Sequence, residues 1–144
     1  MSEPLVFSFD GIPVGKGRPR ATTRGGFARM YTPAKTRTYE SAVKQIAAMA
    51  MRGRKPFVGA LSVSLRLRLG VPKSMSKKVR AVLLSGGQAY LGSFDIDNLV
   101  KSVLDGCNGV CWGDDKQIVR LFATKGAAEA PGIDIRIEPL EPQP

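Results

Sequence analysis

The sequence predicts a single α+β domain in which helices pack on a mixed β-sheet. Stretches that alternate between apolar and polar residues occur near both ends and in the middle of the chain, and stretches of helical periodicity separate them. A chain of 144 residues has room for one core, and neither a linker nor an internal repeat divides it. We therefore expect one domain over residues 1–144.

The N-terminal part predicts a strand followed by a basic loop. Residues 5–9 alternate loosely, and Gly11 and Pro13 end this strand. Residues 14–27 hold glycines and basic side chains without apolar periodicity, which predicts a mobile loop. Either this loop contacts phosphate groups or it is only solvated.

A short strand and an amphipathic helix follow the loop. Thr32 is the expected N-cap and Pro33 the expected first helical residue, and the helix should end near Met51. Residues 61–69 alternate cleanly and predict the clearest strand of the chain. Its polar face, which carries Arg66 and Arg68, would be a nucleic-acid surface or a solvated face.

The remaining elements complete the expected sheet. A short basic helix should follow Ser74 or Ser76 and end at Gly86 and Gly87. Two further strands are expected within KQIVRLFATK and GIDIRIEPL, and the tail over residues 139–144 should fray.

The charge of the protein is strongly uneven along the chain. Residues 1–94 carry 17 Lys and Arg against 3 Asp and Glu, whereas residues 95–144 carry 5 against 9. A basic body that holds a compact acidic cluster suits a polyanionic partner such as nucleic acid. A basic protein with a solvated acidic tail is the alternative.

Composition also limits the chemistry and the location. The sequence has no histidine and only two cysteines, Cys107 and Cys111, which argues against structural zinc and favours two apolar core thiols. No apolar run is long enough for a membrane helix, and the first residues lack the features of a signal peptide. We therefore expect a cytoplasmic protein without a membrane partner.

The segment FDIDNLVKSVLDG, residues 94–106, combines a helical apolar face with three aspartates. Its apolar face consists of Ile96, Leu99, Val100, Val103, Leu104 and Cys107. The opposite stripe carries Asp97, Lys101 and Asp105 at spacings of four, with Asn98 beside them. A solvated helix face with Asp97 as N-cap would explain these residues. Asp95 would crowd Asp97, and two crowded carboxylates favour either a raised pKa or a bound metal.

A second acidic pair, Asp114 and Asp115, stands in GVCWGDDKQ before a predicted strand. An Asp-rich turn is one interpretation, and a third carboxylate beside Asp95 is the other. Three oxygen ligands without histidine specify Mg²⁺ or Mn²⁺. A calcium EF-hand is excluded, because Val100 and Gly106 occupy positions that require Gly and Glu. Spacing alone leaves the metal site and the solvated helix face open.

These two segments together resemble the signature of the RusA family of Holliday junction resolvases. The resemblance rests on DIDNLVK and WGDDKQI, and the blocks GKGRPR, YTPAKTRTYE and PKSMSKK are similar to the phage branch of that family. It implies metal-binding catalytic carboxylates at Asp95, Asp97 and Asp115, and a catalytic lysine at Lys101. Motif positions with a supporting role are Asp105, Asp114 and Asn98. One difference is Ser93-Phe94, where many relatives have Lys-Pro.

The resemblance implies a homodimeric endonuclease that resolves branched DNA by paired symmetric nicks. Its cofactor would be Mg²⁺, with Mn²⁺ as a substitute, and no small-molecule cofactor is expected. A bacterial host and a phage or prophage origin are implied as well. Candidate phosphate contacts are Lys16, Arg18, Arg20, Arg66 and Arg68. The alternative functions are a non-catalytic module that binds branched nucleic acid and a basic protein with a protein partner.

Overall fold

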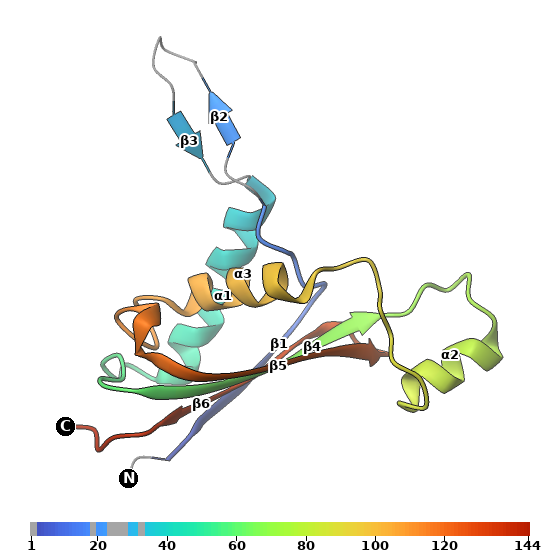
Figure 1. Ribbon diagram of the computed structural model, residues 1–144. Coiled ribbons are helices and arrows are strands. Elements are labelled where there is room, and N and C mark those ends of the chain that lie inside the picture. Colours follow the sequence, from blue (N-terminus) through green and yellow to red (C-terminus); the bar gives the residue numbers. More distant parts are fainter. Residues whose placement is uncertain (1–2, 18–19, 23–28, 32–33) are drawn as a thin grey trace.

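The computed structural model describes residues 3–17, 20–22, 29–31 and 34–144, and only the backbone within 20–22 and 29–31. It confirms a single small α+β domain with helices packed on a mixed sheet. The sheet contains β1 (Leu5–Asp10), β6 (Gly132–Pro139), β4 (Leu61–Gly70) and β5 (Ile118–Ala128) in that spatial order. β5 runs parallel to β4, whereas β6 is antiparallel to both β1 and β4 (Figure 1).

Strand alternation separates a buried face of the sheet from an open one. The buried side chains of β4 are Leu61, Val63, Leu65, Leu67 and Leu69, as the sequence predicts. β6 contributes Ile133, Ile135 and Ile137 to the same core. The intervening residues, among them Arg66 and Arg136, point to the other side of the sheet.

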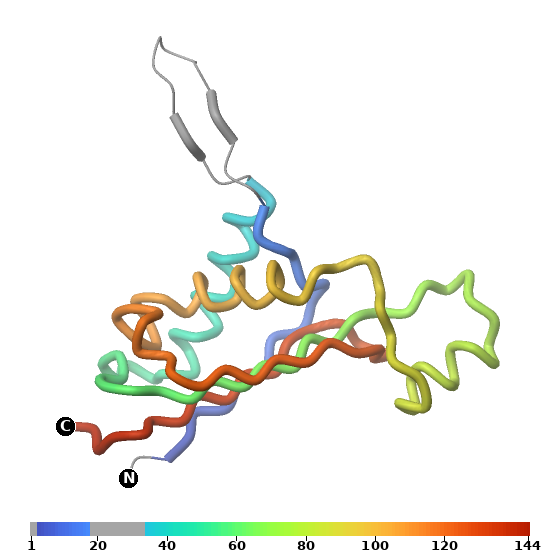
Figure 2. Tube along the Cα trace, viewed as in Figure 1, coloured from blue at the N-terminus to red at the C-terminus, as the bar shows by residue number. Residues whose placement is uncertain are grey.

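Two helices cover the buried face. α1 (Ala34–Met51) and α3 (Ile96–Cys107) pack against each other and against the sheet, as Figure 2 shows. They approach closely at Gly106, where an added Cβ would lie 2.8 Å from the Cβ of Val43. Glycine is therefore required at this crossing, because any larger residue would push the two helices apart.

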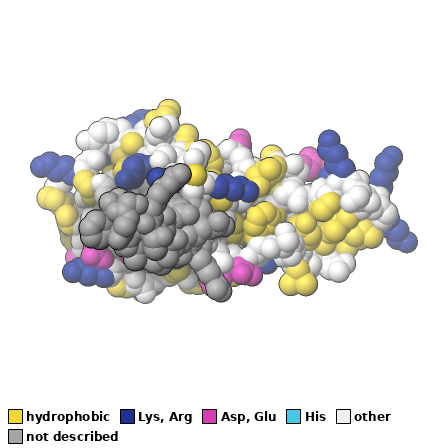
Figure 3. All heavy atoms as spheres, turned by 90° about the horizontal axis from the view of Figure 1, so that it is seen from above, with side chains coloured by type: hydrophobic (Ala, Val, Ile, Leu, Met, Phe, Trp, Pro, Cys, Tyr) yellow, Lys and Arg dark blue, Asp and Glu magenta, His cyan; other side chains and the backbone are white. Residues whose placement is uncertain are grey.

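α2 (Lys77–Leu84) lies away from this layered body, beyond one end of β4 (Figure 1). Ser76 caps it through its hydroxyl, which accepts a hydrogen bond from the backbone of Val79. Hydrophobic side chains gather at this end of the molecule, with basic residues around them (Figure 3). They include Val79 and Leu91, which are both exposed.

The N-terminal basic segment is more structured than the sequence indicates. β2 (Arg20–Thr22) and β3 (Arg29–Tyr31) pair antiparallel, so part of the expected loop over 14–27 is a strand. Residues 14–17 are hydrogen-bonded to α1 and α3. Thr32 and Pro33, the expected start of the helix, lie outside the described residues.

The chain after β6 is tied to the loop before β4. The Gln143 side chain accepts a hydrogen bond from the backbone of Val58 and donates one to its carbonyl, both at 2.9 Å. Leu140 also donates from its backbone to Ala60. These contacts differ from the fraying expected for this tail. In the part of the chain that the structure describes, no helix is both long enough and apolar enough to span a bilayer.

Candidate active site

A pocket of about 510 Å³ lies between α3 and β5. Its apolar floor comes from Val100 and Leu104 on the helix and from Leu121 and Ala123 on the strand. Its polar lining consists of Asp97, Lys101, Asp105 and Asp115. The structure thus brings three carboxylates and one lysine to a single pocket, although Asp115 lies ten residues after Asp105, beyond the end of the helix.

The spacing of α3 explains why its polar lining faces one way. Asp97, Lys101 and Asp105 are separated by four residues each, so they lie one above the other on successive turns. Leu99, Val103 and Cys107 occupy the opposite, buried side and fix the rotation of the helix. Burial of that side therefore presents the charged stripe to the pocket.

Asp95, not Asp97, is the N-cap residue of α3, so the expected position of the cap is wrong by two residues. Asp95 has extended backbone angles and its side chain makes no capping hydrogen bond, whereas Asp97 already belongs to the first helical turn. The Asn98 amide donates to the Asp95 carboxylate over 3.5 Å. The Asp95 carboxylate is therefore exposed beside the pocket, without being part of its lining.

Lys125 fixes the chain that enters α3. Its ammonium group, on β5, donates to the carbonyl oxygens of Leu91 at 2.5 Å and Phe94 at 2.7 Å. These bonds hold the residues just before Asp95 against the sheet edge. Sequence reasoning missed this role, because a lysine in an alternating strand is typical of a solvated face.

The turn before β5 holds Asp115 in a defined direction. Trp112 is fully buried, and its indole N–H donates to the Asp115 carboxylate over 2.9 Å. Asp115 also lines the pocket. The spacing of Trp112 and Asp115 in the sequence thus reflects a hydrogen bond between them.

Asp114 and Gln117 build the turn itself. Asp114 caps the short helix η1 (Asp115–Gln117) by accepting from the backbone of Lys116 at 2.9 Å. The Gln117 side chain accepts from Gly113 and Asp114 and donates to the carbonyls of the chain before β4. Asp114 is therefore a turn residue, and it does not line the pocket.

The candidate DNA-binding residues occupy different environments. Lys16 forms ion pairs with Glu40 and Asp105, and Arg68 forms ion pairs with Asp10 and Asp134. Arg66, on the open face of the sheet, is exposed. Arg18 and the side chain of Arg20 lie outside the described residues.

The donor atoms of the pocket match a hard divalent cation, because all of its acidic ligands are carboxylate oxygens. In the described parts of the chain, however, no three His, Cys, Asp or Glu side chains stand close enough together to hold a metal ion. The donor set therefore fits Mg²⁺ or Mn²⁺ in chemistry, and side-chain movement is needed to assemble it.

The fold and the pocket define a small α+β protein with carboxylates and a lysine at the edge of its sheet, an arrangement suited to phosphate esters. The chain belongs to the RusA endodeoxyribonuclease family, whose family model, "Endodeoxyribonuclease RusA", matches residues 10–138. It is also 32% identical to the uncharacterised protein YqaN of Bacillus subtilis strain 168 over 135 residues, 92% of this chain and 94% of YqaN.

Membership confirms the family resemblance, and the phage branch stays a prediction. The family implies endonuclease activity of the Holliday junction resolvase type, with branched DNA as substrate and a requirement for metal ions.

Proposed function

We propose that this protein is a Mg²⁺-dependent endonuclease that resolves Holliday junctions by paired, symmetric nicks. The observation that carries the proposal is the pocket in which Asp97, Lys101 and Asp115 meet. These residues come from a helix and from a separate turn. Charged side chains that serve only solubility do not need to converge on one pocket, so their convergence favours a functional site. Family membership supplies the substrate class.

Each polar residue has a distinct role in this proposal. Asp95, Asp97 and Asp115 would hold Mg²⁺, or Mn²⁺ in its place, and the bound ion would polarise the phosphate and lower the pKa of water. Lys101 would stabilise the negative charge that develops on the phosphate. Trp112 would keep Asp115 oriented through the indole hydrogen bond. Asn98 would support Asp95 through its amide.

Paired nicking needs two such sites, which a two-fold homodimer would supply. A symmetric dimer would place its pockets on two strands of like polarity in a four-way junction. Among the candidate phosphate contacts, Arg66 has an exposed side chain, whereas Lys16 and Arg68 are engaged by carboxylates. Arg66 is therefore the first residue of this set to test for DNA contact.

The decisive experiment incubates the protein with an end-labelled synthetic four-way junction in Mg²⁺ and in EDTA. We expect symmetric nicks that require Mg²⁺ and that fall by roughly 100-fold or more in Asp97→Asn. The matched control is Glu129→Gln, which neutralises an exposed carboxylate in the turn between β5 and β6. Equal nicking by Asp97→Asn and the wild type would remove Asp97 from the catalytic site.

A non-catalytic module that binds branched DNA is the second candidate. It is favoured by the absence of a preformed group of three ligands among the described residues. Such a module would bind the junction in EDTA as tightly as in Mg²⁺ and would leave it intact. Tight binding without nicks at any Mg²⁺ or Mn²⁺ concentration would therefore support the binding module over the enzyme.

A further inference from the structure

We propose that Lys16 is a positioning residue. Its ion pair with Asp105 keeps Asp105 from pairing with Lys101, so that Lys101 stays available to the substrate phosphate. The inference rests on the proposed function, because it explains how Lys101 avoids pairing with Asp105 on the same helix. Lys16 lies outside the aspartate motifs, in the segment between β1 and β2.

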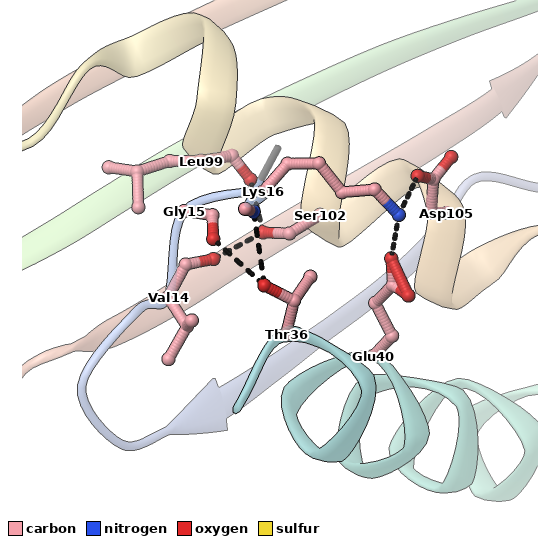
Figure 4. A network of polar contacts seen from close by, with 9 residues as sticks. Val14, Gly15, Lys16, Thr36, Glu40, Leu99, Ser102 and Asp105 are labelled. Carbon is pink, nitrogen blue, oxygen red and sulfur yellow. Dashed lines mark hydrogen bonds and ion pairs between the residues drawn. The ribbon is translucent and has the colours of Figure 1, made fainter. Parts of the chain in front are cut away.

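Lys16 bridges α1 and α3 through two carboxylates. Its ammonium nitrogen lies 2.5 Å from Glu40 and 2.9 Å from Asp105, and Figure 4 shows it directed between them. The three side chains are only 17%, 19% and 27% exposed, for Lys16, Glu40 and Asp105. Partial burial of this kind makes the ion pairs more persistent than pairs on an open surface.

The backbone on either side of Lys16 is anchored to the same two helices. The Lys16 amide donates to the carbonyl of Asn98 over 2.9 Å, and the Ser102 hydroxyl donates to the carbonyl of Val14. The Gly17 amide donates to the Thr36 hydroxyl on α1 over 3.0 Å. Lys16 therefore approaches Asp105 from a fixed position along α3.

The local charges keep Lys16 ionised. Partial burial acts to lower the pKa of Lys16, but hydrogen bonds and Coulomb attraction from Glu40 and Asp105 outweigh it and raise the pKa above its ordinary value. The ammonium group is thus a permanent counter-charge for Asp105 over the physiological pH range.

Asp105 can compete with the substrate phosphate for the ammonium group of Lys101. The two residues are four positions apart on α3 and line the same pocket. Over the described part of the chain, Lys101 takes part in no ion pair, whereas Asp105 pairs with Lys16. If Lys16 were neutral, Asp105 would lose its partner, and the nearest cation on its own helix would be Lys101.

The size of this effect should be moderate. A pair with the basic residue on the N-terminal side is the weaker orientation of the i, i+4 pair in a helix. Capture of Lys101 would therefore be partial, and the loss of rate should be smaller than that caused by removing Lys101 itself.

The test compares Lys16→Met with Glu40→Gln, because both variants break one half of the same bridge. Only Lys16→Met releases Asp105. In single-turnover junction cleavage we expect a rate about tenfold lower for Lys16→Met, with junction affinity unchanged, and a near-normal rate for Glu40→Gln. Adding Asp105→Asn to Lys16→Met should restore most of the rate, because the competitor is gone.

A second measurement does not depend on cleavage. Acylation of Lys101 by an amine-reactive ester, followed by mass spectrometry, reports how accessible and basic its amine is, with exposed Lys44 as the internal reference. Pairing with Asp105 should slow Lys101 labelling roughly threefold in Lys16→Met, and Asp105→Asn should reverse this. If Lys16→Met does not fold like the wild type by circular dichroism, Lys16→Gln replaces it.

The outcomes separate the two proposals. If the wild type does not cleave but Lys101 labelling slows as expected, the positioning role stands and the proposed function fails. If Lys16→Met and Glu40→Gln lower the rate equally, or if Lys101 labelling does not change, Lys16 is a purely structural bridge and the inference is wrong.

Discussion

A few side-chain contacts hold the charged residues in and beside the pocket. Trp112 directs Asp115, Lys125 holds the chain before Asp95, and Lys16 occupies Asp105. None of these three donors is a candidate metal ligand. The candidate site therefore depends on side chains that orient the carboxylates as much as on the carboxylates themselves.

Trp112→Phe tests this dependence directly. The variant keeps an aromatic ring in the core but removes the indole N–H that Asp115 accepts. We expect either that cleavage needs a Mg²⁺ concentration about 10- to 100-fold higher, or that the cleavage rate falls about 10- to 100-fold, because Asp115 is no longer oriented. Cleavage measured over a Mg²⁺ titration would give this result.

Tyr39→Phe is the matched control for that experiment. The Tyr39 hydroxyl is buried, and the described residues offer it no hydrogen-bond partner. Its removal should therefore leave the Mg²⁺ titration unchanged. An equal effect of both variants would mean that Trp112 acts through core packing and not through Asp115.

Among the helices, the contact between α1 and α3 helps to fix the position of the charged stripe formed by Asp97, Lys101 and Asp105. The helices meet at Gly106, one residue after Asp105. Gly106→Ala should lower the free energy of unfolding by about 1–3 kcal/mol, because the new methyl group would overlap Val43.

Urea unfolding would measure this loss, with Ser41→Ala on the exposed side of α1 as the control. The control should change stability by less than about 0.5 kcal/mol. A Gly106→Ala protein as stable as the wild type would show that the two helices can separate at no cost.

Sequence periodicity was sufficient to predict the elements that bury one face. The alternation in β4 and the apolar stripe of α3 both correspond to the observed core, because apolar residues repeat with the period of the strand or helix wherever one face of it is buried. Tertiary hydrogen bonds leave no such pattern. The anchoring of Lys16 and the bond from Lys125 join segments far apart in the chain, so local reasoning predicted a phosphate contact or a solvated loop for Lys16 and overlooked Lys125.

In the described part of the chain, one face of the four-stranded sheet is open, and the two arginines of β4 on it lie in different environments. Arg68 is held by Asp10 and Asp134 and donates to the carbonyl of Ala130, and its side chain is only 14% exposed. Arg66 is exposed on the same face. Two arginines that look alike in the strand pattern are therefore expected to serve different purposes.

Salt titrations of junction binding separate these purposes. Arg66→Ala should reduce the slope of log affinity against log salt concentration by about 1, as expected for one lost phosphate contact. Arg68→Ala should instead lower thermal stability, because Asp10 and Asp134 lose their partner, and should leave that slope unchanged. The reverse result would mean that the open face contacts DNA through Arg68.

The strand order also has a consequence for how the chain folds. Among the described residues, β1 is hydrogen-bonded to β6 alone, so Leu5 pairs with Ile137 from the far end of the domain. Loop-closure entropy makes such a pairing late and slow, and on the ribosome it must wait until residues 132–139 have emerged. A polypeptide that stops before β6 would leave β1 single and one edge of β4 bare, a state prone to aggregation during synthesis.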